Sequence, residues 1–207
     1  MNELKTNDLR VIKTLENIKY GFSFCIRQKP FSSVSVKDII TAARINRSTF
    51  YKYYEDKYRL RELLVKSTLA ELSENINLTS LNLENNKMDE ALNDLQKQLQ
   101  FMYNHKDWYL LLWNENLELY VYEDMVRLFE KRARECFCGN SIEKESTNKG
   151  LLEKQELIAR LFASSAMTTV KWWYEYSPNT APKEVANIIL NDIKYGLHRT
   201  FLQVTTI

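Results

Sequence analysis

Glycine and proline are scarce in this chain. Its 207 residues include 4 Gly and 3 Pro, together about 3% of the sequence against roughly 12% in ordinary proteins. Hairpin turns and phosphate-binding loops need such residues at many positions, because glycine supplies positive φ angles. Sandwiches, barrels and nucleotide-binding α/β folds are therefore disfavoured, and no G-x-G-x-x-G or G-x-x-x-x-G-K-[ST] string occurs. The sequence predicts an all-α protein of long helices joined by few loops.

Long hydrophobic runs are also missing. The longest uninterrupted apolar run, Trp108–Trp113, has six residues, whereas a membrane-spanning helix needs about 20. The N-terminal residues mix charged and apolar side chains and lack the continuous apolar stretch of a secretory signal. The three cysteines, an odd number, favour reduced thiols. We therefore expect a globular, cytoplasmic protein with no membrane segment.

Charge is distributed unevenly along the chain. Residues 1–66 hold 14 Lys and Arg side chains against 7 Asp and Glu, whereas residues 67–207 hold 15 against 20. A basic first third favours contact with a polyanion, although a solvated helical face with an accidental surplus is the alternative.

The first third carries helical periodicity. Apolar side chains recur at spacings of three and four within Leu9–Gln28, which ends before Pro30 because the residue preceding proline avoids the helical region. Ser35 is placed to cap a short second helix, with Asp38 three residues later as a weak capping box.

A third helix is expected over Arg47–Tyr54, after a four-residue turn in which Asn46 can act as the cap. Two short helices joined by such a turn are the layout of a helix-turn-helix. Arg47 carries the planar fork that matches guanine O6 and N7 or clamps a phosphate. For each cation alone, surface solubility is the alternative.

The string S-V-S-V-K-D-I-I-T-A-A-R-I-N-R-S-T-F-Y-K-Y-Y-E-D-K-Y-R-L over residues 33–60 resembles the DNA-binding domain of TetR (tetracycline-repressor-like) transcriptional regulators. The resemblance covers residues 9–66. It implies a three-helix DNA-binding domain with backbone contacts from the tyrosines of the third helix and from the lysine that opens the fourth. The DNA-binding residues we expect are Ser35, Arg44, Arg47, Ser48, Thr49, Tyr51, Lys52, Tyr53 and Lys57.

Arg44 departs from the resembled family, in which most members carry Gly in the turn. If position 44 is left-handed, Arg costs about 1 kcal/mol of backbone strain there. The N-R-S-T-F-Y variant is similar to a subgroup related to regulators of dihydroxyacetone kinase operons.

The remaining two-thirds predict a second helical domain over residues 67–207. About nine helices are expected in the whole chain. The fourth helix is expected from Asp56 to about Ile76. The later helices are expected at Met88–Asn104, Asp107 to about Asn114, Leu117–Phe137, Leu151–Tyr176 and Pro182–Gln203.

The last two helices have features of an association surface, since small residues allow close approach and apolar residues continue a stripe. An isolated bundle needs such stripes internally too. The resemblance implies a homodimer formed by the final two helices as a four-helix bundle. The expected interface residues are Ala163, Ala166, Val170, Ile189, Ile193 and Leu197.

Aromatic residues are dense in the second domain. Aromatic side chains at helical spacing are usually core, and the alternative is an apolar effector cavity with a few polar groups. The resemblance implies that such a cavity lies in this domain and that a bound small molecule releases the DNA. The candidate pocket residues are Phe101, Trp108, Trp113, Phe129, Phe162 and Trp172.

An enzyme is not expected, because only two histidines occur and the H-E-x-x-H, G-x-S-x-G and C-x-x-C motifs are absent. Cys136 and Cys138 point about 200° apart on a helix, which favours packing over a metal site. No metal or other cofactor is expected.

The sequence therefore predicts a DNA-binding transcriptional regulator, acting as a repressor, that binds a palindromic operator as a homodimer and is released by an apolar or aromatic effector. The alternative is a helical protein-interaction co-regulator without an effector ligand or without autonomous DNA binding.

Overall fold

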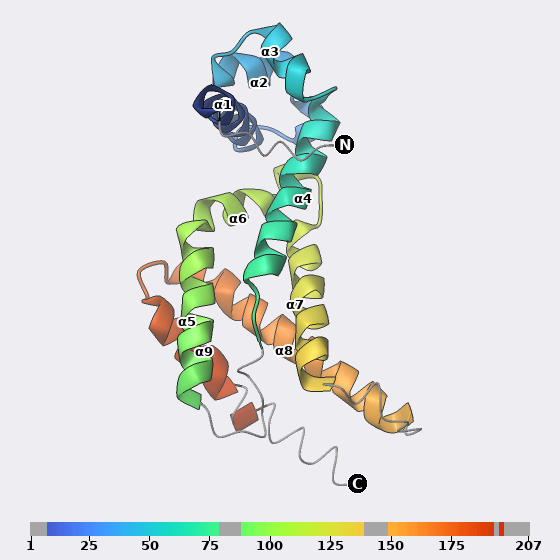
Figure 1. Ribbon diagram of the computed structural model, residues 1–207, viewed down its shortest axis with the longest axis vertical. Helices are drawn as coiled ribbons and strands as arrows, with labels where there is room; N and C mark the ends of the chain where they lie inside the picture. The colour runs from blue at the N-terminus through green and yellow to red at the C-terminus, as the bar shows by residue number, and fades with distance from the viewer. Residues whose placement is uncertain (1–7, 79–87, 139–148, 193–194, 197–207) are drawn as a thin grey trace. The chain divides into compact units, whose positions relative to one another are not determined.

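The computed structural model describes residues 8–78, 88–138, 149–192 and 195–196 (Figure 1). Over these ranges the chain is helical and contains no strand. The all-α prediction is confirmed. No helix within them combines the length and the apolar composition needed to cross a membrane.

The chain forms two compact units that are discontinuous in sequence. The first unit comprises Met1–Ala70 and Asp107–Val121, and the second comprises Glu71–Lys106 and Tyr122–Ile207. The sequence predicts one domain boundary, at residue 66. In the structure, residues 107–121 also belong to the first unit.

The first unit begins with five helical elements. These are α1 (Leu9–Ile26), the 3-10 turn η1 (Phe31–Ser33), α2 (Val36–Ala43), α3 (Arg47–Tyr53) and α4 (Lys57–Asn75), whose last five residues belong to the second unit. The core of this unit is apolar and fully enclosed, and it includes Ile18, Phe22, Ile39, Phe50 and Leu60.

The crossing of α1 and α2 requires a glycine. α1 packs against α2, and a Cβ added at Gly21 would lie 2.6 Å from the carbonyl oxygen of Ile39 and 2.8 Å from the Cβ of Ala43. Because real Cβ contacts are not this short, the two helices approach each other only where α1 has no side chain. One of the four glycines is therefore used inside a helix, for packing.

The segment that returns to the first unit contains most of α6 (Lys106–Leu112) and the 3-10 turn η2 (Glu115–Leu117). Polar contacts attach it to α1 and α4. The indole Nε1 of Trp108 donates to Thr68 Oγ1 at 2.8 Å, and the side-chain Nδ2 of Asn116 donates to the carbonyl of Ile26 at 3.0 Å.

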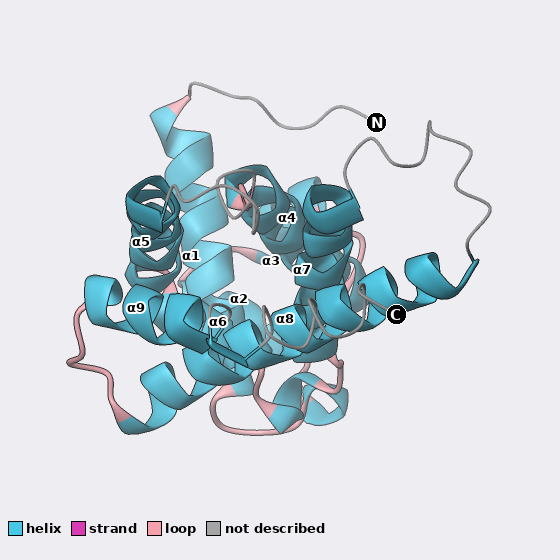
Figure 2. Ribbon diagram, turned by 90° about the horizontal axis from the view of Figure 1, so that it is seen from below, coloured by secondary structure: helices cyan, strands magenta, loops and turns pink. Residues whose placement is uncertain are grey.

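The second unit contains α5 (Met88–Asn104), α7 (Val121–Cys138), α8 (Lys149–Tyr176) and α9 (Pro182–Asp192). α9 packs against both α5 and α8, as the view of Figure 2 also shows. The connection between α8 and α9 is fixed by aromatic side chains. Tyr103 stacks on Trp173 with ring centroids 5.0 Å apart, the Tyr103 hydroxyl donates to the carbonyl of Pro178 at 2.8 Å, and Trp173 Nε1 donates to that of Thr180 at 2.9 Å.

Most helix bounds follow the sequence expectation. α5 occupies the predicted range Met88–Asn104, but α7 begins at Val121 rather than at Leu117. The reason is local, because Glu118 has φ 56° and ψ 39°, a left-handed conformation that interrupts the helix. The predicted end of the last helix, at Gln203, lies outside the described residues.

Candidate nucleic-acid interface and ligand cavity

The N-terminus of α2 is closed by the expected capping box. Ser35 Oγ accepts from the Asp38 amide at 3.2 Å, and Asp38 Oδ2 accepts from the Ser35 amide at 2.8 Å. Lys29 Nζ lies 2.9 Å from the same carboxylate oxygen. The Lys29 hydrogen bond, followed by those from Ser35, lowers the pKa of Asp38 to about 2. The carboxylate therefore stays ionised and holds the start of α2 and the end of the preceding connection together.

The turn between α2 and α3 is built on Arg44. This residue has φ 53° and ψ 45°, so the left-handed conformation considered from the sequence is present. Its amide donates to the carbonyl of Thr41 at 3.2 Å, and the amide of Ile45 donates to that of Ile40 at 3.1 Å. These are the hydrogen bonds of a Schellman-type helix end, in which Gly is the usual left-handed residue. The exposed Arg44 side chain takes no part in them.

α3 is short and its direction is set by one buried ring. Phe50 is fully buried, and its ring lies against those of Tyr51 and Tyr54 at centroid distances of 5.5 and 5.7 Å. Asn46 occupies the predicted N-cap position, but its side chain forms no capping hydrogen bond. With Phe50 pointing inward, the opposite side of α3 faces solvent.

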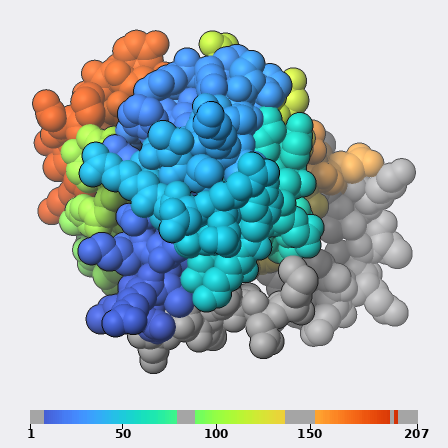
Figure 3. Space-filling view, turned by 90° about the horizontal axis from the view of Figure 1, so that it is seen from above, coloured from blue at the N-terminus to red at the C-terminus, as the bar shows by residue number. Residues whose placement is uncertain are grey.

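That solvent-facing side gathers polar and cationic groups. Figure 3 looks onto the face formed by α1, α2 and α3, coloured blue to cyan. Four of the predicted DNA-binding residues on α3 are exposed, and two are half-buried. The exposed residues are Arg47, Ser48, Tyr51 and Lys52, and the half-buried ones are Thr49 and Tyr53.

The cations on this face are available to phosphates. Within the described part of the chain, neither Arg44, Arg47 nor Lys52 has a carboxylate within ion-pair distance. Arg47 instead lies over the ring of Tyr51, with its Cζ 5.4 Å from the centroid and Nη2 3.5 Å from the hydroxyl. This pairing across one helical turn orients the guanidinium without neutralising it.

Lys57 has a structural environment that the sequence did not reveal. Its ammonium donates to the carbonyls of Phe31, Ser32 and Val34 at 2.9, 3.0 and 2.6 Å. An ammonium has three donor hydrogens, so all of them are used. The predicted phosphate contact from Lys57 stays a prediction, and it requires the side chain to give up one of these bonds.

Glu118 also joins this region, and sequence reasoning missed it. Its carboxylate accepts from the Ser32 amide at 3.1 Å and from the Ser32 hydroxyl at 2.7 Å. Arg61 donates to the neighbouring carbonyl of Leu117 at 2.9 Å while its guanidinium lies 3.8 Å from the centre of the Phe31 ring. The partners in these hydrogen bonds are more than 50 residues apart in sequence, so no local pattern signals them.

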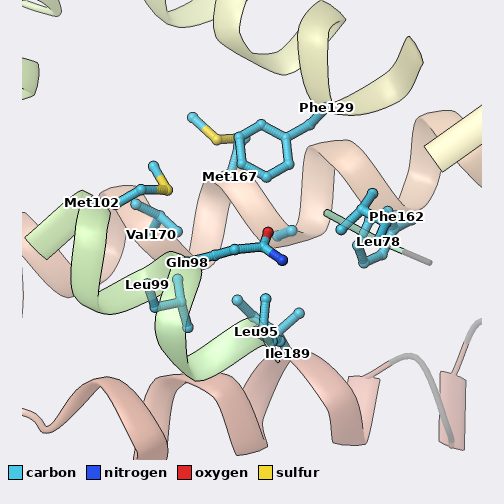
Figure 4. Close-up of a pocket in the computed structure, with 11 residues that line it drawn as sticks. Leu78, Leu95, Gln98, Leu99, Met102, Phe129, Phe162, Met167, Val170 and Ile189 are labelled. Atoms are coloured by element: carbon cyan, nitrogen blue, oxygen red, sulfur yellow. The ribbon is translucent and has the colours of Figure 1, made fainter. Parts of the chain in front are cut away.

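The second unit encloses a small apolar cavity of about 10 Å³, shown in Figure 4. Side chains from α5, α7, α8 and α9 form its wall together with Leu78, and Gln98 is the only polar one. The lining residues are Leu78, Leu95, Gln98, Leu99, Met102, Phe129, Phe162, Ala166, Met167, Val170 and Ile189.

The six candidate pocket residues do not come together. Phe129 and Phe162 line the cavity. Trp108 and Trp113 belong to the first unit, where Lys19 covers Trp108 at 4.0 Å, and Trp172 is exposed on α8. Phe101 packs against the ring of His105 at a centroid distance of 4.7 Å. A sequence stretch rich in aromatic residues does not specify which helix faces converge, and four of the six do not line this cavity.

Four of the six residues expected at a dimer interface are buried within the single chain. Ala163, Ala166, Val170 and Ile189 are buried inside the single chain, and the last three line the cavity. Their assignment to an intermolecular surface is wrong, because the apolar stripe is used by the protein's own core. Ile193 and Leu197 lie outside the described residues.

Cys136 is held by packing and a hydrogen bond. Its Sγ donates to the carbonyl of Leu78 at 2.9 Å, and burial raises the pKa of the thiol. The side chain of Cys138 lies outside the described part of the structure.

The first unit has the features of a helix-turn-helix DNA-binding domain: two short helices, a tight left-handed turn and a second helix with an exposed cationic face. Residues 25–64 match the family described as bacterial regulatory proteins, tetR family. This segment is therefore a TetR-type DNA-binding domain.

Two individual proteins are similar to this chain. The chain is 27% identical over 77 residues to an uncharacterized HTH-type transcriptional regulator, YxbF, of Bacillus subtilis (strain 168), a match that spans 37% of this chain and 20% of that relative. The structure is similar to that of the dihydroxyacetone kinase operon activator DhaS, with a TM-score of 0.56 and 17% identity, covering 92% of this chain and 98% of that one. The second likeness shows a shared fold.

Proposed function

We propose that this protein is a transcriptional repressor that binds a palindromic operator as a homodimer and is released by a small molecule bound in its second unit. The observation that carries the DNA-binding part is the exposed, unpaired cationic face of α3 within the segment that matches the family. Arg47 reads a base or clamps a phosphate from the N-terminal end of α3, while Lys52 and Arg44 add positive charge beside it.

The proposed dimer uses a surface that the structure leaves open. On α8, Leu157, Leu161, Thr168 and Trp172 are exposed and lie at spacings of four, seven and four, so they share one side of the helix. α9 adds the exposed Ile188. Exposed apolar side chains aligned on the last two helices support a helix-to-helix contact between two copies. We call this the α8–α9 stripe.

The DNA-binding proposal is tested by selection and titration. The purified full chain is used to enrich duplexes from a random-sequence library, and the enriched duplex is titrated by fluorescence anisotropy at several salt concentrations. We expect sub-micromolar, sequence-selective binding that weakens steeply with salt. Absence of any selective, salt-sensitive complex would overturn the regulator proposal and favour the protein-interaction module.

The Arg47→Ala variant tests whether Arg47 contributes to recognition of the DNA sequence. We expect the variant to lose about tenfold in discrimination between the enriched duplex and a scrambled one, because a bidentate Arg–guanine pair contributes about 1–3 kcal/mol. Arg127→Ala is the matched control, since Arg127 lies on α7 and pairs with Asp124 at 2.8 Å. An unchanged preference in Arg47→Ala would mean that Arg47 only contacts the backbone.

The direction of regulation is tested in cells. A reporter gene placed behind the enriched duplex is expected to be expressed less when the protein is present. Higher expression would show that the protein activates and would overturn the repressor part alone.

A further inference from the structure

The cavity of the second unit contains one polar group in an otherwise apolar wall. Gln98 projects from α5 among the lining side chains, as Figure 4 shows. The other lining residues carry no polar side-chain atom except the thioethers of Met102 and Met167, and none carries a charge. Any molecule held here is therefore recognised by shape, apolar contact and the carboxamide of Gln98.

The orientation of that carboxamide is fixed. Gln98 Nε2 donates to the carbonyl of Asn77 in a short hydrogen bond. Reversing the amide would place two acceptor oxygens against each other, so the amide oxygen is the atom left over. Gln98 Oε1 is buried and has no hydrogen-bond partner within the described part of the chain.

A buried acceptor without a donor costs free energy, and most such groups in folded proteins are paired. A bound molecule that donates an N–H or O–H to Oε1 removes this cost. A charged molecule is disfavoured, because the wall offers no opposite charge to compensate its desolvation.

The cavity, at about 10 Å³, has room for about one water molecule. Two of its walls are the side chains of Met102 and Met167. Methionine is unbranched and flexible, so these side chains are the part of the wall that can move to admit a larger group. A compact molecule of the order of a single ring therefore enters only when these side chains are displaced.

We propose that this cavity binds a small, uncharged, mainly apolar molecule that donates one hydrogen bond to Gln98 Oε1 and is admitted by displacement of Met102 and Met167. The inference deepens the effector part of the proposed function, on which its regulatory meaning rests. The binding itself is measured without DNA.

The test uses two probes of nearly equal size, phenol and toluene, which differ in having a hydroxyl donor or a methyl group. The full chain is labelled at its methionine methyl groups with carbon-13 and titrated with each probe. We expect phenol to shift the Met102 and Met167 signals at roughly tenfold lower concentration than toluene. Met125, which is buried in α7 but does not line the cavity, is the internal reference.

Substitution of the acceptor decides the role of Gln98. In Gln98→Leu we expect the phenol dissociation constant to rise about tenfold, while toluene binds as well as before or better. Gln100→Leu is the matched control, because Gln100 is exposed on the same helix and bonds to Asn104. Equal binding of the two probes to the unmodified protein, an unchanged ratio in Gln98→Leu, or no response of Met102 and Met167 would overturn the proposal.

The probe titration and the duplex selection distinguish failure of the cavity proposal from failure of the proposed function. If the enriched duplex binds but the methionine signals do not respond to phenol, the cavity proposal is wrong and the DNA-binding proposal stands. If phenol binds through Gln98 but no duplex is selected, the cavity stands and the regulator proposal is wrong.

Discussion

At the scale of single residues, Arg44 has two opposing effects: it lowers the stability of the fold and adds positive charge for DNA binding. Its left-handed backbone is unfavourable for any residue with a Cβ, yet its exposed guanidinium adds positive charge next to α3. The turn hydrogen bonds use only backbone atoms, so glycine can form them equally well. Glycine is scarce in the sequence, and this turn is one of the places where it is missing.

Arg44→Gly is expected to raise the free energy of unfolding by up to about 1 kcal/mol, because the left-handed strain is relieved while glycine is more flexible when unfolded. The same variant is expected to bind DNA more weakly, with a salt slope smaller by about one. Urea unfolding and anisotropy measure the two effects. Arg44→Lys keeps both the strain and the charge, and is expected to match the unmodified protein in both measurements.

At the scale of elements, the short helices of the first unit are held by polar groups at their ends. α2 begins with the Ser35–Asp38 capping box and the Lys29 ion pair. α4 begins with Lys57, a cation at a helix N-terminus, where the helix dipole disfavours positive charge. The three carbonyls around its ammonium compensate for this and attach the segment 31–34 to α4.

Asp38→Asn is expected to destabilise the protein in a pH-dependent manner. The pKa of Asp38 is lowered to about 2 in the folded chain, from an ordinary value of 3.8. A lowered pKa stabilises the fold above the ordinary value and stops doing so as the pH falls towards the folded value. Because this pair is more than a third exposed, we expect its contribution to be below about 1 kcal/mol.

Urea unfolding of Asp38→Asn and of the unmodified protein, compared at pH 6 and at progressively lower pH, measures this effect. Their difference in free energy of unfolding should shrink as the pH falls from about 4 towards about 2. A difference that stays constant over this range would show that the carboxylate charge does not stabilise α2.

Lys57→Met is expected to lower the free energy of unfolding by about 2 kcal/mol, since three carbonyls lose a charged donor while the aliphatic stem is retained. Lys66→Met is the matched control, because Lys66 is an exposed lysine on the same helix. Thermal and urea unfolding compare the two. If both variants unfold alike, the ammonium does not anchor the 31–34 segment.

The salt dependence of DNA binding tests whether Lys57 also contacts a phosphate, in addition to its structural role. Measured well below the unfolding transition, Lys57→Met is expected to reduce the salt slope by about one only if the ammonium also reaches a phosphate. An unchanged slope would leave Lys57 with the structural role alone.

The same elements show how far sequence reasoning reached. The Ser35 cap and the turn at Arg44 were predicted, because capping and turn geometry depend on residues within a few positions. The contacts of Lys57 and Glu118 were not, because their partners are brought near only by the fold.

At the scale of the whole molecule, the α8–α9 stripe connects the single chain to the proposed dimer. A two-fold dimer presents two copies of α3 to successive major grooves of a palindromic site. The interface must then use side chains that the chain itself leaves exposed, whereas four of the residues predicted from the sequence are buried, namely Ala163, Ala166, Val170 and Ile189.

Leu161→Glu is expected to convert the protein to a monomer and to weaken operator binding, because an unpaired carboxylate is costly to bury between two copies. Leu119→Glu is the matched control, since Leu119 and Leu161 are both 40% exposed but Leu119 belongs to the first unit and is not part of the stripe. Sedimentation velocity reports the mass of each variant. A dimeric Leu161→Glu, or an unmodified protein that sediments as a monomer, would contradict the proposed interface.

The sequence by itself determined that the chain is helical, where most helices lie, and that a TetR-type DNA-binding segment lies in its first third, where residues 25–64 match the family. These properties depend on periodicity, caps and a compact motif, all of which are local in the chain. Only the tertiary structure decided that Trp108 belongs to the first unit, that Ala166 and Val170 line a cavity, and that Gln98 is its one polar group. An apolar stripe specifies that a helix face must be covered, but the neighbouring element that covers it is selected by packing across the whole unit.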